Sequence, residues 1–262
     1  MQSPPIPKPS DFPSSLNLTI TPPDSQRSSN ILLLLHGLGD SLTPFTSFGA
    51  ALHLPETTCI TLQAPTPLPF ELPGYHWGDD LVFEADILDS DPGFTRSTRL
   101  IVQDLIRSVL VDKLGYSGRD ILIFGFAQGA SVALSVALEL HRENAESSPT
   151  GNNNDTARRE LGGVIAVGGV LPLSAIKEQG SRANKSKTPV LVLGGSSQGS
   201  AVSEGGVRRT KGEFEYVEVV RWKGKREDTM PRNREEMLPI MQFFGRRLRS
   251  YSGVPEGSIE IG

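Results

Sequence analysis

The sequence predicts an α/β fold with a mostly parallel sheet and helices on both faces. Short aliphatic runs such as 31–35 are too short for a helix and are typical of strands buried on both sides. These runs alternate with amphipathic helical patterns, as at 94–114 and 232–249. Buried strands that alternate with such helices favour a parallel sheet that is covered on each face.

The N-terminal half is expected to supply three strands, two helices and one long loop. Strands are predicted at 16–20, 31–35 and 57–62, and a helix around 45–52. The segment 63–92 is dense in proline, glycine and aromatic residues, which predicts a long, structured loop. A longer helix is predicted over 94–114, and Gly115 is its expected end.

The C-terminal half is expected to continue the same alternation. Strands are predicted at 120–126, 164–167, 189–193 and 214–222. One helix is expected to begin just after the strand 120–126 and to end near residue 140. A closing helix is predicted over 232–249, with its apolar residues on one face.

Most of the 262 residues are expected to form one layered domain, 16–249. A flexible leader rich in proline and serine, 1–15, precedes it, and a short tail, 250–262, follows. The stretch 143–160 contains the polar run SSPTGNNND and is predicted to be a disordered surface insertion.

Composition excludes several classes of protein. The chain has one cysteine, which rules out a disulfide framework and suits a reducing compartment. Its formal charge of −4 gives no general attraction to nucleic acid or to anionic membranes. No stretch is long and apolar enough to span a membrane, and the N-terminus does not look like a secretory signal, so a cytoplasmic location is expected. No histidine or carboxylate grouping has metal-ligand spacing, and neither a metal nor a cofactor is expected.

The most specific local pattern is a predicted strand that runs into Gly125-Phe126-Ala127-Gln128-Gly129 and then into a helix. This arrangement frames a nucleophile elbow, in which two glycines permit a sharp turn that lifts the central side chain above the sheet. Backbone amides at the start of the helix can then stabilise an oxyanion. The same pattern also fits a tight strand–helix turn with small residues and no chemistry.

A second motif, His36-Gly37-Leu38-Gly39-Asp40, follows an earlier predicted strand. With both motifs in this order, the sequence resembles the phospholipase/carboxylesterase family, which includes the acyl-protein thioesterases. The resemblance covers about 31–248. It implies an α/β-hydrolase fold and the hydrolysis of carboxylic esters or acyl thioesters, acyl-proteins and lysophospholipids included.

The resemblance also assigns candidate site residues. It implies that Leu38 and Gln128 supply two oxyanion amides and that His36 belongs to the oxyanion turn. Trp77 and Asp79 resemble the W-x-D segment beside the family's acyl pocket, with the loop 63–92 over that pocket.

Three departures from the family pattern bear on function. Ala127 stands where the family has its nucleophilic serine, and a methyl group cannot attack a carbonyl. Gln198 stands near the expected acid, and Glu227 or Asp228 stands where the base is expected. No histidine follows His141 in the sequence, so all three triad roles are vacant. What remains is at most an oxyanion hole and binding, worth roughly 10³–10⁴ over the reaction in water.

The first hypothesis is therefore a non-catalytic relative that binds an acyl ligand or a protein partner in the old cleft. The second is a hydrolase with a rearranged site, in which His76 with Asp79 or Asp80 activates water. Ser131 is a weaker candidate nucleophile, since it lies one turn into the helix. Cys59 is expected to be a buried core thiol.

A third hypothesis is a structural or interaction protein that uses a basic C-terminal face. The segment 221–249 holds nine Lys or Arg and four acids, a net charge of +5, which leaves −9 for the rest of the chain. Such a face would dock anions or a partner. Because acids are interspersed among the cations, a solvated helix face and its loop is the simpler interpretation.

His53 and His141 are expected to be surface or helix-end residues.

Overall fold

The protein has a seven-stranded sheet at its centre, as expected for an α/β fold. The computed structural model describes residues 4–81, 83–84, 87–88, 91–146, 160–176, 184–197 and 199–250. In spatial order the strands are β1 (Leu18–Thr21), β3 (Thr57–Leu62), β2 (Asn30–Leu35), β8 (Ile121–Phe126), β9 (Gly163–Val167), β10 (Val190–Gly195) and β11 (Val217–Trp222). Only β1 is antiparallel to its neighbour. The prediction of a mostly parallel sheet is confirmed.

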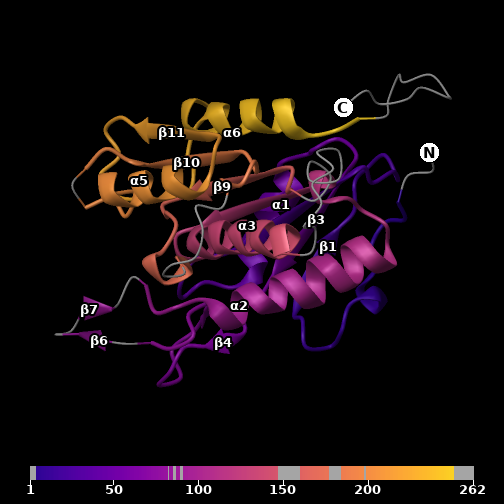
Figure 1. Cartoon of the computed structure of the whole chain (residues 1–262), viewed down its shortest axis with the longest axis horizontal. Helices are drawn as coiled ribbons and strands as arrows, with labels where there is room; N and C mark the ends of the chain where they lie inside the picture. The colour runs from indigo at the N-terminus through magenta and orange to yellow at the C-terminus, as the bar shows by residue number, and fades with distance from the viewer. Residues whose placement is uncertain are drawn as a thin grey trace.

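Helices cover both faces of this sheet (Figure 1). On one face lie α2 (Thr95–Arg99), its continuation η2 (Leu100–Lys113), α3 (Gln128–Glu146) and α5 (Glu204–Glu213); on the other lie α1 (Leu42–Ala51) and α6 (Arg234–Arg247). The strand β2 shows why both layers are needed. Its Leu33 packs into the first layer and its Leu34 into the second, and both are fully buried.

The long predicted helix 94–114 is present, and it changes its hydrogen-bonding pattern. α2 begins at Thr95, and η2 continues it in a wider π-type form, with bonds five residues apart such as Leu114 N to Val109 O at 2.9 Å. Gly115 ends the helix with φ of +79°, a left-handed conformation that glycine adopts without steric cost.

Two regions differ from the sequence-based expectation. The helix α5 was not predicted, because only Val207, Thr210 and Gly206 of its ten residues are buried and three of the ten are glycines. The loop 63–92 contains two short antiparallel pairs, β4 (Thr66–Pro67) with β5 (Tyr75–His76) and β6 (Phe83–Glu84) with β7 (Ile87–Leu88).

The edges of the domain also need correction. From residue 4 onward, the segment predicted as a flexible leader contacts the domain: Tyr116 Oη donates to Pro5 O at 3.1 Å, and Lys113 pairs with Asp11 at 3.0 Å. The helix α3 continues to Glu146, so the first residues of the predicted insertion 143–160 are helical. Residues 147–159 and 251–262 lie outside the described part of the chain.

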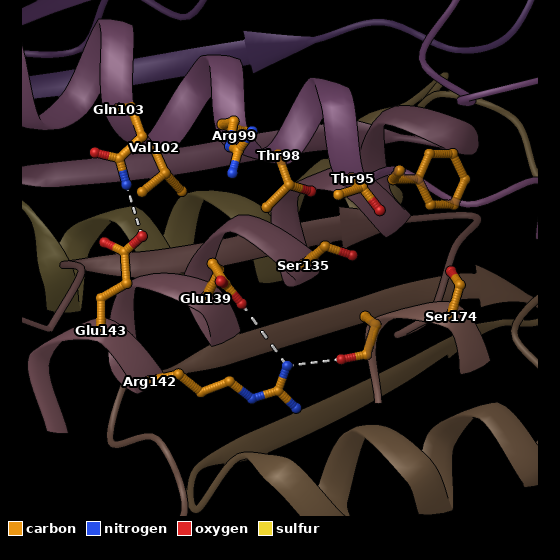
Figure 2. A pocket seen from close by; sticks show the side chains of 12 residues that line it. Thr95, Thr98, Arg99, Val102, Gln103, Ser135, Glu139, Arg142, Glu143 and Ser174 are labelled. Atoms are coloured by element: carbon orange, nitrogen blue, oxygen red, sulfur yellow. Dashed lines mark hydrogen bonds and ion pairs between the residues drawn. The ribbon is translucent and has the colours of Figure 1, made fainter. Parts of the chain in front are cut away.

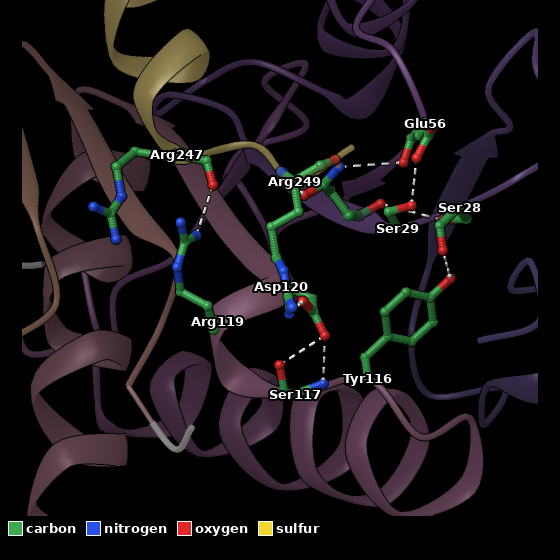
Figure 3. Close-up of polar contacts among 10 residues, drawn as sticks. Ser28, Ser29, Glu56, Tyr116, Ser117, Arg119, Asp120, Arg247 and Arg249 are labelled. Atoms are coloured by element: carbon green, nitrogen blue, oxygen red, sulfur yellow. Dashed lines mark hydrogen bonds and ion pairs between the residues drawn. The ribbon is translucent and has the colours of Figure 1, made fainter. Parts of the chain in front are cut away.

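After the closing helix α6, the chain passes the amino ends of the strands β2 and β8 (Figure 3). There the side chain of Asn30 bonds both backbone groups of Arg249, each at 2.8 Å, and Arg249 Nη1 reaches Asp120 Oδ1 at 2.7 Å. Arg119 Nη1 donates to Arg247 O at 2.6 Å. These bonds hold the end of the domain against the start of β2 and the residues just before β8, which lie more than a hundred residues earlier in the sequence.

Candidate active site and family

The turn from β8 into α3 has the backbone of a nucleophile elbow. Ala127 sits at its tip with φ of +49°, a left-handed conformation that costs an alanine about 1–2 kcal/mol. The Ala127 N–H donates to Val167 O at 2.8 Å, which ties the tip to the neighbouring strand β9. The strained geometry that presents a catalytic side chain is therefore retained around a methyl group.

The two glycines of the elbow are required by close packing. A Cβ at Gly125 would lie 2.3 Å from Gly129 O, and a Cβ at Gly129 would lie 2.4 Å from Leu35 O. Neither distance is compatible with a side chain, so only glycine permits the helix to approach the strands so closely. The sequence-based interpretation of this turn is supported by its geometry.

The turn after β2 lies directly beside the elbow. A Cβ at Gly37 would lie 3.5 Å from Ala127 Cβ. The backbone N–H groups of Leu38 and Gln128 have no hydrogen-bond acceptor among the described residues. Two amides from these adjacent turns are thus available in the place where the resemblance expects an oxyanion hole.

His36 shapes this turn from inside the core. Its Nδ1 donates to Gly37 O at 2.7 Å, and its Nε2 accepts from Ala64 N at 3.0 Å, which fixes one neutral tautomer. Burial lowers the pKa of His36, although the Gly37 carbonyl opposes that shift. With both ring nitrogens engaged, His36 acts as a structural hydrogen-bonding group.

Trp77 joins three parts of the site and is fully buried. Its indole Nε1 donates to His36 O at 2.8 Å, and its backbone N donates to Gln128 Oε1 at 2.7 Å. Its carbonyl accepts from Ser97 Oγ at 2.6 Å. Trp77 therefore holds the oxyanion turn, the elbow and the helix α2 together.

The carboxylate of Asp79 caps α2 rather than activating His76. Its two oxygens accept from Thr95 N and Arg96 N, both at 2.8 Å. No hydrogen bond joins His76 to Asp79 within the described residues. Burial lowers the pKa of His76, and its Nδ1 makes no well-formed hydrogen bond there, although the Gly78 backbone interacts with the ring. The expected His76–Asp79 couple is not assembled.

Asp228, one of the two residues expected at the place of the base, faces the loop in which the acid was expected. Its Oδ1 accepts from Gly195 N at 2.7 Å and from Ser200 Oγ at 2.9 Å, and its Oδ2 accepts from Ala201 N at 2.6 Å. The Asp228 carboxylate thus joins the loop after β11 to the end of β10 and the loop after it. Glu227 is exposed, and Gln198 lies outside the described residues.

The other candidate nucleophiles have structural roles. Ser131 Oγ donates to Val170 O at 3.1 Å from within α3. Cys59 is a buried core thiol, as predicted, and burial raises its pKa to about 12.

His53 and His141 were both expected at helix ends or on the surface. His53 is exposed, as expected. The expectation is wrong for His141, which is partly buried inside a helix. His141 lies within α3, half-buried, with its Nδ1 2.7 Å from Glu160 Oε1 and its Nε2 2.7 Å from Asn184 O. No pattern in the sequence indicates this contact, because Glu160 and Asn184 follow a long polar segment.

Fewer than half of the cations of the basic C-terminal face, 221–249, are paired with acids among the described residues. Four of its nine cations form ion pairs, namely Arg221 with Glu204, Lys225 with Glu236, Arg246 with Glu218 and Arg249 with Asp120. A fifth, Arg247, donates to Gly162 O at 2.8 Å. Lys223, Arg226, Arg232 and Arg234 are exposed and lack a side-chain partner among the described residues.

No described helix has the length and apolar character needed to cross a membrane. Within the described residues, no three His, Cys, Asp or Glu side chains gather as metal ligands would.

The parallel sheet and the elbow turn together define a protein of the α/β-hydrolase fold. Comparison with known proteins identifies its family within that fold. The family model of phospholipases and carboxylesterases matches residues 17–146. An uncharacterised hydrolase of Mycosarcoma maydis is 30% identical over 233 residues, covering 87% of this chain and 80% of that protein. An uncharacterised hydrolase of Schizosaccharomyces pombe is 36% identical over 150 residues, a match that spans 55% of either protein. The chain belongs to the phospholipase/carboxylesterase family.

Solved structures agree with this assignment at the level of the fold. Acyl-protein thioesterase 2 of Zea mays superposes with a TM-score of 0.61 and 19% identity, over 89% of this chain and 99% of that one. A carboxylesterase of Mesorhizobium loti superposes with a TM-score of 0.58 and 13% identity, over 91% and 98% of the two chains.

Proposed function

We propose that this protein is a non-catalytic member of its family that binds an acyl ligand in the former catalytic cleft. The observation that carries the proposal is the combination of a retained elbow with a methyl group at its tip. Ala127 keeps the strained φ of +49° while offering no nucleophile. The vacant base position strengthens the argument, because Asp228 is held there by three donors of the neighbouring loop.

The retained groups favour binding of a carboxylate or carbonyl head group. The free amides of Leu38 and Gln128 are donors that suit an anionic oxygen. Because Trp77 and His36 hold these turns in place, the amides are preorganised for such an oxygen. A fatty acid, or an acyl group on a peptide, is the ligand class that the family resemblance indicates.

Binding is tested by thermal shift and calorimetry with laurate, using dodecanol as a probe that lacks the carboxylate. Laurate is expected to raise the melting temperature in a saturable manner. Ala127→Asp places a carboxylate at the elbow in a conformation that aspartate tolerates, and it is expected to abolish laurate binding. The neutral Ala127→Asn is the matched control and should retain more affinity. Equal binding of laurate by the wild type and Ala127→Asp would overturn the proposed site.

The names of the two fungal relatives favour the competing interpretation, an active hydrolase. Purified protein is therefore incubated with a short-chain nitrophenyl ester and with a fluorophosphonate probe. We expect neither turnover nor labelling above the blank. Turnover that a single substitution abolishes, with His76→Ala as the first variant and Ser131→Ala as the second, would contradict a non-catalytic role.

A further inference from the structure

A groove of about 610 Å³ lies between the helix α2–η2 and the helix α3 (Figure 2). This volume is in the range of about 300–1,000 Å³ that is typical of small-ligand sites. Its lining residues are Phe94, Thr95, Thr98, Arg99, Val102, Gln103, Ser135, Glu139, Arg142, Glu143, Ser174 and Ala175. Ala127 and the other residues of the elbow turn are not among them.

One wall of the groove offers hydrogen-bond donors. Thr95, Thr98 and Arg99 are three and four residues apart on the same helix, and their side chains face α3 (Figure 2). The guanidinium of Arg99 is exposed and makes no ion pair or hydrogen bond with the described residues. A guanidinium beside hydroxyl groups is suited to a carboxylate.

The opposite wall carries the balancing charges. Glu139 and Arg142 approach each other to 3.9 Å, and Arg142 is held by Ala175 O at 2.7 Å. Glu143 pairs with Arg107 at 2.7 Å and accepts from Gln103 Nε2 at 2.6 Å. The lining therefore has two cationic and two anionic side chains.

This balance selects the class of ligand. A dianion such as phosphate would be repelled by the two glutamates, and a simple cation by the two arginines. A molecule with both a carboxylate and an ammonium group can face Arg99 at one end and Glu139 at the other. Phe94 and Val102 add apolar contact area. We propose that the groove binds a zwitterionic amino-carboxylate the size of an amino acid or a short peptide.

The test is calorimetry at low salt with the dipeptide Ala-Leu and with its N-acetylated and C-amidated forms, each of which lacks one charge. We expect Ala-Leu to bind and each capped form to bind at least about tenfold more weakly, the loss of one charge-assisted bond. Arg99→Ala should weaken Ala-Leu binding by a similar factor. Arg96→Ala is the matched control, since Arg96 is exposed on the same helix but does not line the groove.

Three outcomes would overturn the proposal. These are no heat of binding with Ala-Leu up to about 10 mM, equal affinity for the capped forms, and unchanged affinity in Arg99→Ala. Arg99 is exposed, so the variant is expected to fold, and circular dichroism verifies this. None of these outcomes depends on laurate binding at Ala127. The proposed function and the proposed groove ligand are therefore tested independently.

Discussion

The carboxylate of Asp228 accepts a 2.7 Å hydrogen bond from the Gly195 backbone, and this bond joins the loop after β11 to the end of β10. Ser200 Oγ and Ala201 N also donate to this carboxylate, at 2.9 and 2.6 Å. Because all three donors belong to the end of β10 and the loop after it, the carboxylate holds these two segments of the chain together.

Asp228→Asn is expected to destabilise the protein by about 2–3 kcal/mol, since the carboxylate accepts three hydrogen bonds and an amide can accept at only one atom. Urea denaturation measures the change in the free energy of unfolding. Glu227→Gln is the matched control at the next residue, which is exposed, and should change stability by less than about 0.5 kcal/mol. Equal effects of the two substitutions would show that the three bonds contribute nothing.

Ala127→Gly is expected to stabilise the protein by about 0.5–1 kcal/mol, because glycine relieves the left-handed strain that alanine bears at φ of +49°. In an ordinary right-handed helix, by contrast, replacing alanine with glycine lowers the stability of the protein. Ala50→Gly, at an exposed position in α1, serves as the control and should cost about 0.5–1 kcal/mol. If Ala127→Gly also lowers the melting temperature, the elbow is not strained.

Asn30→Ala is expected to cost about 2–4 kcal/mol, because it leaves both backbone groups of Arg249 without their partner at a buried position. Arg246→Ala, in α6, removes an exposed ion pair with Glu218 of β11 and should cost no more than about 1 kcal/mol. Thermal melts of the two variants compare them directly. A melting temperature for Asn30→Ala equal to that of Arg246→Ala would contradict the role assigned to this contact.

The pair His141–Glu160 is expected to make stability depend on pH. The hydrogen bond to Glu160 raises the pKa of His141 above its ordinary 6.5, so its contribution is complete below 6.5 and is lost as pH rises through the raised pKa. Burial opposes ionisation of Glu160, but bonds from His141, Thr188 and Ser186 together lower its pKa below 4.5, so its contribution is lost as pH falls through that lower value. The pair is therefore most stabilising between about 4.5 and 6.5.

Urea denaturation of wild type and His141→Gln near pH 6 and at about pH 9 tests this prediction. The stability difference between the two proteins should be larger at the lower pH. His53→Gln, at an exposed histidine, is the control and should leave the pH dependence unchanged. A difference for His141→Gln that does not vary with pH would refute the coupling.

Sequence reasoning predicted the sheet and the elbow well because these depend on local patterns. The aliphatic run 31–35 is a fully buried strand, and the spacing of Gly125 and Gly129 follows from how closely α3 approaches β2. It missed α5, whose pattern is polar and glycine-rich. Side-chain partners across the fold were also out of reach: Asp79 caps α2, and Asp228 binds the loop after β10, because tertiary packing decides which donors a carboxylate meets.

Restoring a serine at position 127 distinguishes a non-catalytic protein from a hydrolase that lacks only its nucleophile. Ala127→Ser returns a hydroxyl to an elbow that already has the left-handed backbone, and the proposed non-catalytic function requires that no acid and base are present to activate it. Turnover of a short-chain nitrophenyl ester is measured for this variant beside the wild type. We predict that Ala127→Ser remains close to the blank. Substantial turnover from this single substitution would contradict the account, because it would mean that a working acid and base are present elsewhere in the chain.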